Sequence, residues 1–302
     1  MRVRVVLVAC ALAGCGRLDF GAIEVAHDAT ADACTLGAFS TPTLLPGPVQ
    51  SPADDWYPTP TLGETQLYFH SYRTGSLGAD LWYATRADPA SPFGTPIRIV
   101  ELATTDNENQ PTLTEDALDL IYAVDPAAGP AELWESQRAT TTESWPMSVA
   151  LASVNSASTD TSPFIDAEGL RLIFASAGRA DGVGGLDLYE TTRADRQSQF
   201  QPVVHLDTLA SAQDDFAPTL SADGLEIIFS SARGGSSHLY TARRPTLDQP
   251  FAAPTAMPEV TSTMDDVGSR LAPSGRTLYF NYDTLTLGGA NADLWTSTRA
   301  CQ

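Results

Sequence analysis

The sequence contains no lysine: all 17 basic residues are arginines, and they are outnumbered by 37 acidic residues. Without lysine the chain cannot form a Schiff base with a carbonyl substrate through an ε-amino group. The formal net charge of −20 at pH 7 argues against binding nucleic acid or anionic lipid by electrostatics, because both need a basic footprint. The same charge suits a soluble, self-repelling surface.

Motifs that mark common catalytic and cofactor sites are also missing. There is no Gly-x-Ser-x-Gly elbow, no phosphate-binding loop and no dinucleotide fingerprint. No Cys-x-x-Cys occurs, and metal-ligand spacing is absent among the four histidines, His27, His70, His205 and His238. We therefore expect no cofactor, with Ca²⁺ left open for the acidic residues considered below.

What the chain does have is a repeat, Leu-[Trp/Tyr]-x-x-x-Arg, found five times at residues 81–86, 133–138, 188–193, 239–244 and 294–299. In four copies an aromatic follows the arginine after seven residues: Phe93, Trp145, Phe200 and Phe251. After Arg299 the chain ends too soon, and the matching segment, residues 39–42, lies at the start of the domain. A repeat whose two ends complete each other predicts a closed ring.

Each repeat contains four short apolar segments separated by turns such as Asp223-Gly224. The fourth segment begins with proline in every copy, which suits an edge strand because proline cannot donate to a β-ladder: Pro42, Pro96, Pro146, Pro202 and Pro254. Four-stranded sheets repeated roughly every fifty residues indicate a β-propeller. We predict an all-β fold over residues 34–302, with five four-stranded antiparallel blades. An N-terminal outer strand completes the C-terminal blade.

The repeat also resembles a known family. Residues 160–176 with 184–189, and residues 215–231, resemble the WD40-like propeller repeats of TolB-type and outer-membrane-lipoprotein-associated proteins. The resemblance implies a propeller that is usually periplasmic or surface-exposed and usually serves recognition. It does not imply one activity, because propellers serve as both enzymes and scaffolds.

The N-terminus predicts a targeting segment over residues 1–14. Arg2 and Arg4 precede an apolar run that is too short to span a bilayer. Residues 12–15, Leu-Ala-Gly-Cys, resemble the lipobox of bacterial lipoproteins, in which the chain is cut before the cysteine and Cys15 carries the lipid. The alternative is an ordinary signal peptide with an incidental cysteine. Residues 15–33 then form a tether, and Gly16 favours the outer membrane by the same resemblance. We expect the lipid to be the protein's only contact with the membrane.

An acid stands three residues before the aligned proline, or serine in the last copy, of each repeat: Asp55, Glu108, Asp160, Asp215 and Asp266. In a propeller this position precedes the innermost strand, so the acids should ring one mouth of the central channel. They could bind a cation such as Ca²⁺ or polarise a substrate. Alternatively, each acid stabilises its own blade through backbone N–H groups or a nearby arginine such as Arg73, Arg179 or Arg233. The second interpretation is favoured because the acid is present in every blade.

Residues that do not repeat are better site candidates, and four should lie on the face of the acids: Trp56, Tyr57, His70 and Phe216. Aromatics beside carboxylates suit sugar or peptide binding, whereas Trp56 could equally fill the channel. The sequence therefore predicts an envelope module that binds a protein or a glycan. The rival is a carbohydrate-active enzyme that uses the ring acids, although their apparent equivalence weighs against distinct catalytic roles.

Two cysteines remain once Cys10 is lost with the signal peptide and Cys15 is lipidated. Cys34 and Cys301 map to the same point of the repeat. In an oxidising compartment this predicts a disulfide that joins the outer strand of the split blade to its other strands.

Overall fold

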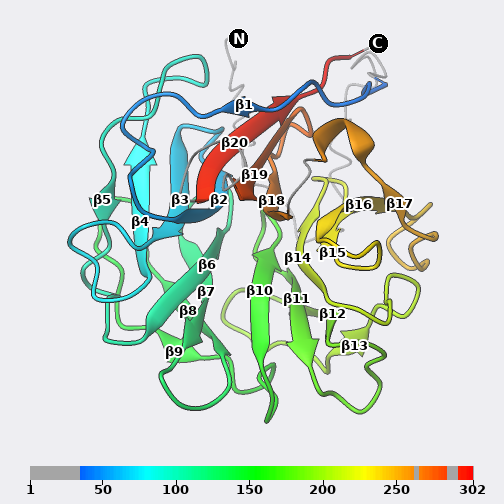
Figure 1. Ribbon diagram of the computed structural model, residues 1–302. Helices are drawn as coiled ribbons and strands as arrows, with labels where there is room; N and C mark the ends of the chain where they lie inside the picture. The colour runs from blue at the N-terminus through cyan, green and yellow to red at the C-terminus, as the bar shows by residue number, and fades with distance from the viewer. Residues whose placement is uncertain (1–34, 262–264, 284–291, 302) are drawn as a thin grey trace, which may run out of the picture. The chain divides into compact units, whose positions relative to one another are not determined.

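The computed structural model describes residues 35–261, 265–283 and 292–301. Within these ranges regular structure is almost all β, with one short 3₁₀ turn at Pro258–Val260. The strands form five separate four-stranded antiparallel sheets. The prediction of an all-β, five-bladed propeller is confirmed (Figure 1).

From the innermost strand outward, the blades contain the following strands. Blade 1 has β2 (Asp55–Thr61), β3 (Gln66–Ser71), β4 (Asp80–Thr85) and β5 (Ile97–Arg98). Blade 2 has β6 (Asn107–Leu113), β7 (Asp119–Asp125), β8 (Glu132–Gln137) and β9 (Val149–Ala150). Blade 3 has β10 (Asp160–Ile165), β11 (Arg171–Ala177), β12 (Leu186–Thr192) and β13 (Val204–His205). Blade 4 has β14 (Asp215–Leu220), β15 (Glu226–Ser231), β16 (His238–Arg243) and β17 (Thr255–Ala256). Blade 5 has β18 (Asp266–Leu271), β19 (Thr277–Asp283), β20 (Ala292–Thr298) and, from the N-terminal side, β1 (Thr43–Leu44).

The ring closes through the split blade. β1 pairs antiparallel with β20, so that Thr43 lies opposite Thr296 and Leu44 opposite Trp295. In Figure 1 the blue β1 runs beside the red β20. β18 and β19 in turn contact β2 of blade 1. The N-terminal outer strand that the sequence predicted is therefore present.

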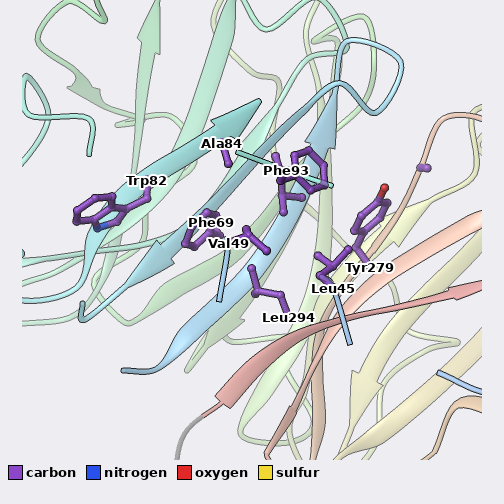
Figure 2. Packing of buried hydrophobic residues seen from close by; sticks show 10 residues of the cluster. Leu45, Val49, Phe69, Trp82, Ala84, Phe93, Tyr279 and Leu294 are labelled. Carbon is purple, nitrogen blue, oxygen red and sulfur yellow. The ribbon is translucent and has the colours of Figure 1, made fainter. Parts of the chain in front are cut away.

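A buried apolar cluster fills the junction between blades 5 and 1. Figure 2 shows Leu294 of β20, Tyr279 of β19 and Phe69 of β3 in this cluster, with Leu45 and Phe93 from neighbouring loops. Burial of each such side chain contributes about 1.5–3 kcal/mol relative to leaving it exposed. The closing junction is thus stabilised by side-chain packing as well as by the short β1–β20 ladder.

The repeated arginine explains why the signature is present in every blade. Its guanidinium lies over the aromatic that follows seven residues later, at 4.1–4.6 Å from the ring centroid: Arg86–Phe93, Arg138–Trp145, Arg193–Phe200, Arg244–Phe251 and, across the split, Arg299–Phe39. Its Nε donates to a carbonyl of the turn between the first two strands, at 2.6–2.9 Å. The arginine therefore joins the outer loop of a blade to its inner turn.

The same arginine also contacts the preceding blade. Arg193 of blade 3 forms ion pairs with Asp119 and Glu135 of blade 2, and Arg299 of blade 5 pairs with Glu226 of blade 4 at 2.8 Å. In blades 1 and 2 the acceptor is a tyrosine hydroxyl of the neighbouring blade. The motif therefore links adjacent blades around the ring.

Candidate functional site

Three of the ring acids are fully buried and paired with arginine. One carboxylate oxygen of Asp55 accepts a hydrogen bond from Nη2 of Arg73 at 2.6 Å, and the other accepts one from the N–H of Ser51 at 2.8 Å. Blade 3 repeats the ion pair with Asp160 and Arg179 at 2.8 Å, and blade 4 repeats it with Asp215 and Arg233 at 2.7 Å. Each arginine also donates to a carbonyl of the loop before the strand, at Val49, Val154 or Leu209. These carboxylates do not face an open channel mouth, and their geometry matches the architectural interpretation.

Glu108 differs from the other ring acids. In blade 1, Asp55 lies opposite Ser71, and Arg73 follows Ser71 by two residues. In blade 2, Glu108 lies opposite Val124, and the residue two positions later is Pro126. Glu108 is completely buried and accepts hydrogen bonds from the N–H and hydroxyl of Thr104. Burial raises the pKa of this carboxyl to about 7, and the nearby charge of Asp80 acts in the same direction. The side chain of the fifth acid, Asp266, lies outside the described residues.

Tyr57 and His70 are buried, with exposed fractions of 6% and 5%. The Tyr57 hydroxyl lies 3.4 Å from Oγ of Ser162, and its backbone N–H donates to Asn281 at 2.7 Å. Nδ1 of His70 accepts the N–H of Gln110 at 3.1 Å, and burial lowers the pKa of this histidine to about 3. Both side chains are therefore buried, and neither offers an exposed surface to a partner. Tyr57 reaches from blade 1 to Ser162 of blade 3, and His70 contacts Gln110 of the adjacent blade 2.

A β-bulge in each innermost strand accounts for the placement of Tyr57. The register shifts in β2, β6, β10, β14 and β18. One residue in each bulge has positive φ: Tyr57, Gln110, Ser162, Ala217 and Gly268. A bulge changes the direction of a side chain relative to the regular alternation. The period-two pattern of the sequence could not anticipate it.

Trp56 and Phe216 remain as partly exposed aromatics. Each directly follows a buried ring acid, as do the half-exposed Asn109 and Thr161, and Val267 at the aligned position of blade 5 is also half-exposed. Phe216 also packs against the core between blades 3 and 4. The half-exposed position thus carries a different side chain in each blade.

Sequence reasoning missed Arg270, the largest fully buried side chain. From blade 5 its Nη1 donates to the carbonyl of Pro218 in blade 4 at 2.7 Å, and its Nη2 donates to the carbonyl of Pro163 in blade 3. Burial lowers the pKa of the guanidinium to about 10. The available signal was its departure from the repeat, because the aligned positions are Thr59, Thr112, Phe164 and Thr219.

A central pocket of about 60 Å³ lies where the innermost strands end, at the opposite end of the channel from the ring acids. All five blades contribute to its lining, which includes Thr59, Thr112, Phe164, Leu220 and Arg270. Larger grooves lie between blades, such as one of about 400 Å³ beside Glu135, Arg193 and Phe200. The pocket at this end of the channel is therefore small.

No metal site is apparent in the described ranges, where His, Cys, Asp and Glu side chains form no cluster of three or more suited to an ion. In the same part of the chain no helix is long and apolar enough to cross a membrane.

Comparison with solved structures shows the fold alone. TolB from Acinetobacter baumannii is 14% identical with a TM-score of 0.54; the match covers 82% of this chain but only 55% of that one. Putative TolB from Agrobacterium tumefaciens is 13% identical over 89% of this chain and 99% of its own, with a TM-score of 0.52. The GH43_1 enzyme from Xanthomonas citri, solved with xylotriose, is 12% identical over 84% and 89% with a TM-score of 0.60. No protein-family model and no curated protein matches the chain. The propeller is thus shared with TolB proteins and with glycoside hydrolases alike.

Proposed function

We propose that this protein is a recognition or scaffold propeller of the bacterial cell envelope that binds a protein or a glycan. One observation supports binding over catalysis: Asp55, Asp160 and Asp215 are buried and bonded to arginine. Glycosidases need two carboxylates in different roles, about 5–10 Å apart across the scissile bond. Acids that are consumed in blade architecture cannot supply that arrangement.

The recognition surface includes the half-exposed ring that contains Trp56 and Phe216. Aromatic side chains with some exposure are frequent anchors for protein and sugar partners. The test is a pull-down from envelope extract with Trp56→Ala as bait, and Asn109→Ala as the control at the same position of blade 2. Loss of a hot-spot aromatic costs about 2 kcal/mol or more, so we expect the captured partner to bind at least about thirtyfold more weakly. Unchanged capture by Trp56→Ala, or an equal loss of capture with Asn109→Ala, would show that Trp56 is not part of the recognition surface.

A second candidate function is glycoside hydrolysis, and Glu108 is the residue that favours it. A carboxyl that titrates near neutral pH without a cationic partner has the property of a general acid. Its complete burial weighs against this role. A panel of aryl glycosides tests it: we expect no turnover, whereas turnover that Glu108→Gln abolishes would establish the enzyme.

The lipid anchor at Cys15 is part of the proposal, and it lies outside the described residues. Lipid attachment follows from the resemblance of residues 12–15 to a lipobox, and Gly16 after the cysteine favours the outer membrane. Mass spectrometry of the mature protein should find Cys15 at the N-terminus with more than one acyl chain, since a single chain gives only marginal attachment. Cys15→Ser should leave the protein unprocessed. An unmodified N-terminus elsewhere contradicts the anchor.

The disulfide between Cys34 and Cys301 also stays a prediction, because Cys34 lies outside the described residues. It is supported by the isolated β-bridge between Leu36 and Cys301, which brings the segment just after Cys34 beside Cys301. Non-reducing peptide mapping should recover the two cysteines in one linked peptide. The chain-entropy model gives such a long loop an upper value of roughly 5 kcal/mol. Recovery of Cys34 as a free thiol would disprove the pairing.

A further inference from the structure

The junction between blades 2 and 3 sets two carboxylates against one guanidinium. Arg193 of blade 3 pairs with Asp119 through Nη2, and with Glu135 through Nη1 at 2.6 Å. The carboxylates share one further donor, the neutral amide of Gln137, whose Nε2 lies 3.3 Å from Oδ2 of Asp119 and 3.2 Å from Oε1 of Glu135. The Asp119 side chain is fully buried, and that of Arg193 is 1% exposed. With both acids ionised, the cluster therefore holds one excess negative charge away from water, which is costly.

The geometry favours a proton shared by the two acids. Asp119 and Glu135 lie within hydrogen-bond reach of each other, and two carboxyl groups can form that bond only when one of them is protonated. Burial raises the pKa of Asp119 to about 7, and the charge of Glu135 acts in the same direction, whereas Arg193 lowers it. Oδ1 of Asp119 is buried, and no donor among the described residues reaches it. The ionised form of Asp119 is therefore poorly satisfied.

The junction between blades 4 and 5 shows the balanced arrangement. Glu226 is the first residue of its second strand, as Asp119 is in blade 2, and it pairs with Arg299 at 2.8 Å. At the position of Glu135, blade 4 has Thr241. One carboxylate thus meets one guanidinium at that junction, and it supplies a matched control.

Other charged groups around the cluster do not remove the excess. Arg196 pairs with Asp116 at 2.7 Å, and Asp195, whose charge interacts with that of Arg193, is exposed and adds negative charge. Glu135, Arg193 and Arg196 line the groove of about 400 Å³ between the two blades. Glu135 is 12% exposed, so the shared proton can pass through it to water in the groove.

We propose that the cluster of Asp119, Glu135 and Arg193 is a pH-sensitive clasp that holds blades 2 and 3 together while it shares one proton and loosens when that proton is lost. Loss of the proton leaves two carboxylates in contact, and their repulsion favours separation of the blades and entry of water. Between the ordinary pKa of 3.8 and about 7, the folded state keeps a proton that the unfolded chain has lost. The clasp therefore weakens as pH rises through this window and stays weak above it. The inference does not depend on the proposed recognition function, because Trp56 lies in blade 1.

The test is backbone amide hydrogen exchange of the mature protein at pH 6 and pH 8.5, with each rate corrected for its intrinsic pH dependence. We expect the protection of β7, β8 and β12 to fall by at least about tenfold between the two values, because one unit of pKa difference is tenfold in the opening equilibrium. Asp119→Asn keeps a neutral group that can donate to Glu135, so it should abolish most of this fall. Glu226→Gln, the control at the same position of blade 4, should leave the ratio between the two pH values unchanged. A fall in Asp119→Asn equal to that in the natural protein would overturn the proposal.

A second variant and a direct measurement keep the proposal testable if Asp119→Asn does not fold. Glu135→Gln gives the junction one acid for one guanidinium, as between blades 4 and 5, and it should also abolish most of the fall in protection. Carbon-13 NMR of the Asp119 carboxyl follows the proton itself. Its titration midpoint should lie well above 3.8 in the natural protein and drop by at least about one pH unit in Glu135→Gln, since a like charge is removed. A midpoint that Glu135→Gln leaves unchanged would show that the two acids share no proton.

Discussion

The guanidinium of Arg299 lies 4.6 Å from the centroid of the Phe39 ring, although the two residues come from opposite ends of the propeller. Arg299 also donates to the Gly275 carbonyl at 2.6 Å and pairs with Glu226 of blade 4 at 2.8 Å. One side chain therefore connects the N-terminal segment, the blade it completes and the blade before it. The contact with the aromatic ring and the bond to the inner turn occur within a continuous chain in the other four blades, so the split copy is equivalent to an intact one in these two contacts.

Replacing Arg299 with Gln should lower the free energy of unfolding by about 3 kcal/mol or more. The variant loses the cation that faces the buried negative charge of Glu226, and it also loses the cation–π contact with Phe39. Urea unfolding measures the change. The exposed Arg243 provides the control: Arg243→Gln should stay within about 0.5 kcal/mol. Equal effects in the two variants would show that ring closure does not depend on Arg299.

Replacing Asp160 with Asn should also destabilise the fold, by about 2 kcal/mol at neutral pH. The change keeps the shape but removes the charge that faces Arg179, whose partial exposure of 17% reduces the loss relative to a fully buried pair. Chemical unfolding of Asp160→Asn beside Asp195→Asn checks the value. A variant as stable as the natural protein would mean that the ring acid is not architectural.

Glu108 predicts a specific pH dependence. Its pKa is about 7 in the folded protein, above the ordinary value of 4.5. Between these values the folded state keeps a proton that the unfolded chain has lost, so stability falls as pH rises from about 4.5 to 7 and levels off above it. The loss amounts to at most about 3 kcal/mol, at 1.36 kcal/mol for each unit of pKa difference.

Glu108→Gln isolates this contribution, because other titrating groups cancel in the difference between the two proteins. The stability difference between variant and natural protein, from urea unfolding at pH 4.5, 6 and 8, should move in favour of the variant as pH rises. A constant difference across this range would show that Glu108 does not titrate there.

Gly268 provides a test of the bulge. The aligned residue of blade 4, Ala217, also has a positive φ (51°, against 68° for Gly268), so alanine can adopt this backbone conformation. A Cβ on Gly268 would nevertheless lie 2.9 Å from Oδ1 of Asn281 and 3.2 Å from the Tyr57 ring. Gly268→Ala should therefore cost about 1–3 kcal/mol through overpacking. The reciprocal Ala217→Gly should change stability by less than about 1 kcal/mol. Thermal unfolding of both variants compares them, and equal effects would indicate that Tyr57 does not restrict the site.

The fold could be predicted from the sequence because the same local pattern occurs in five copies. Turn residues, alternating apolar segments and the proline before each outer segment recur in every copy, so each blade confirms the others. The displaced Phe39 segment identified the closing strand. The side-chain positions of the site are harder to predict: Tyr57 is a candidate because it does not repeat, whereas the bulge between Trp56 and Thr59 directs it inward.

The sequence by itself determined the number of blades, their strands and the way the ring closes, because these depend on short-range periodicity and on a repeat that is complete only when its ends meet. Only the tertiary structure decided between a cation site and ion pairs with arginine for the ring acids. Asp55 and Asp160 pair with arginines from a loop after the second strand, whereas Glu108 forms no ion pair with the described residues, because Pro126 stands in place of the arginine. It also placed Arg270 against carbonyls of two other blades. These Arg270 contacts join residues 52 and 107 positions apart across the channel, where burial and charge depend on what the other blades supply.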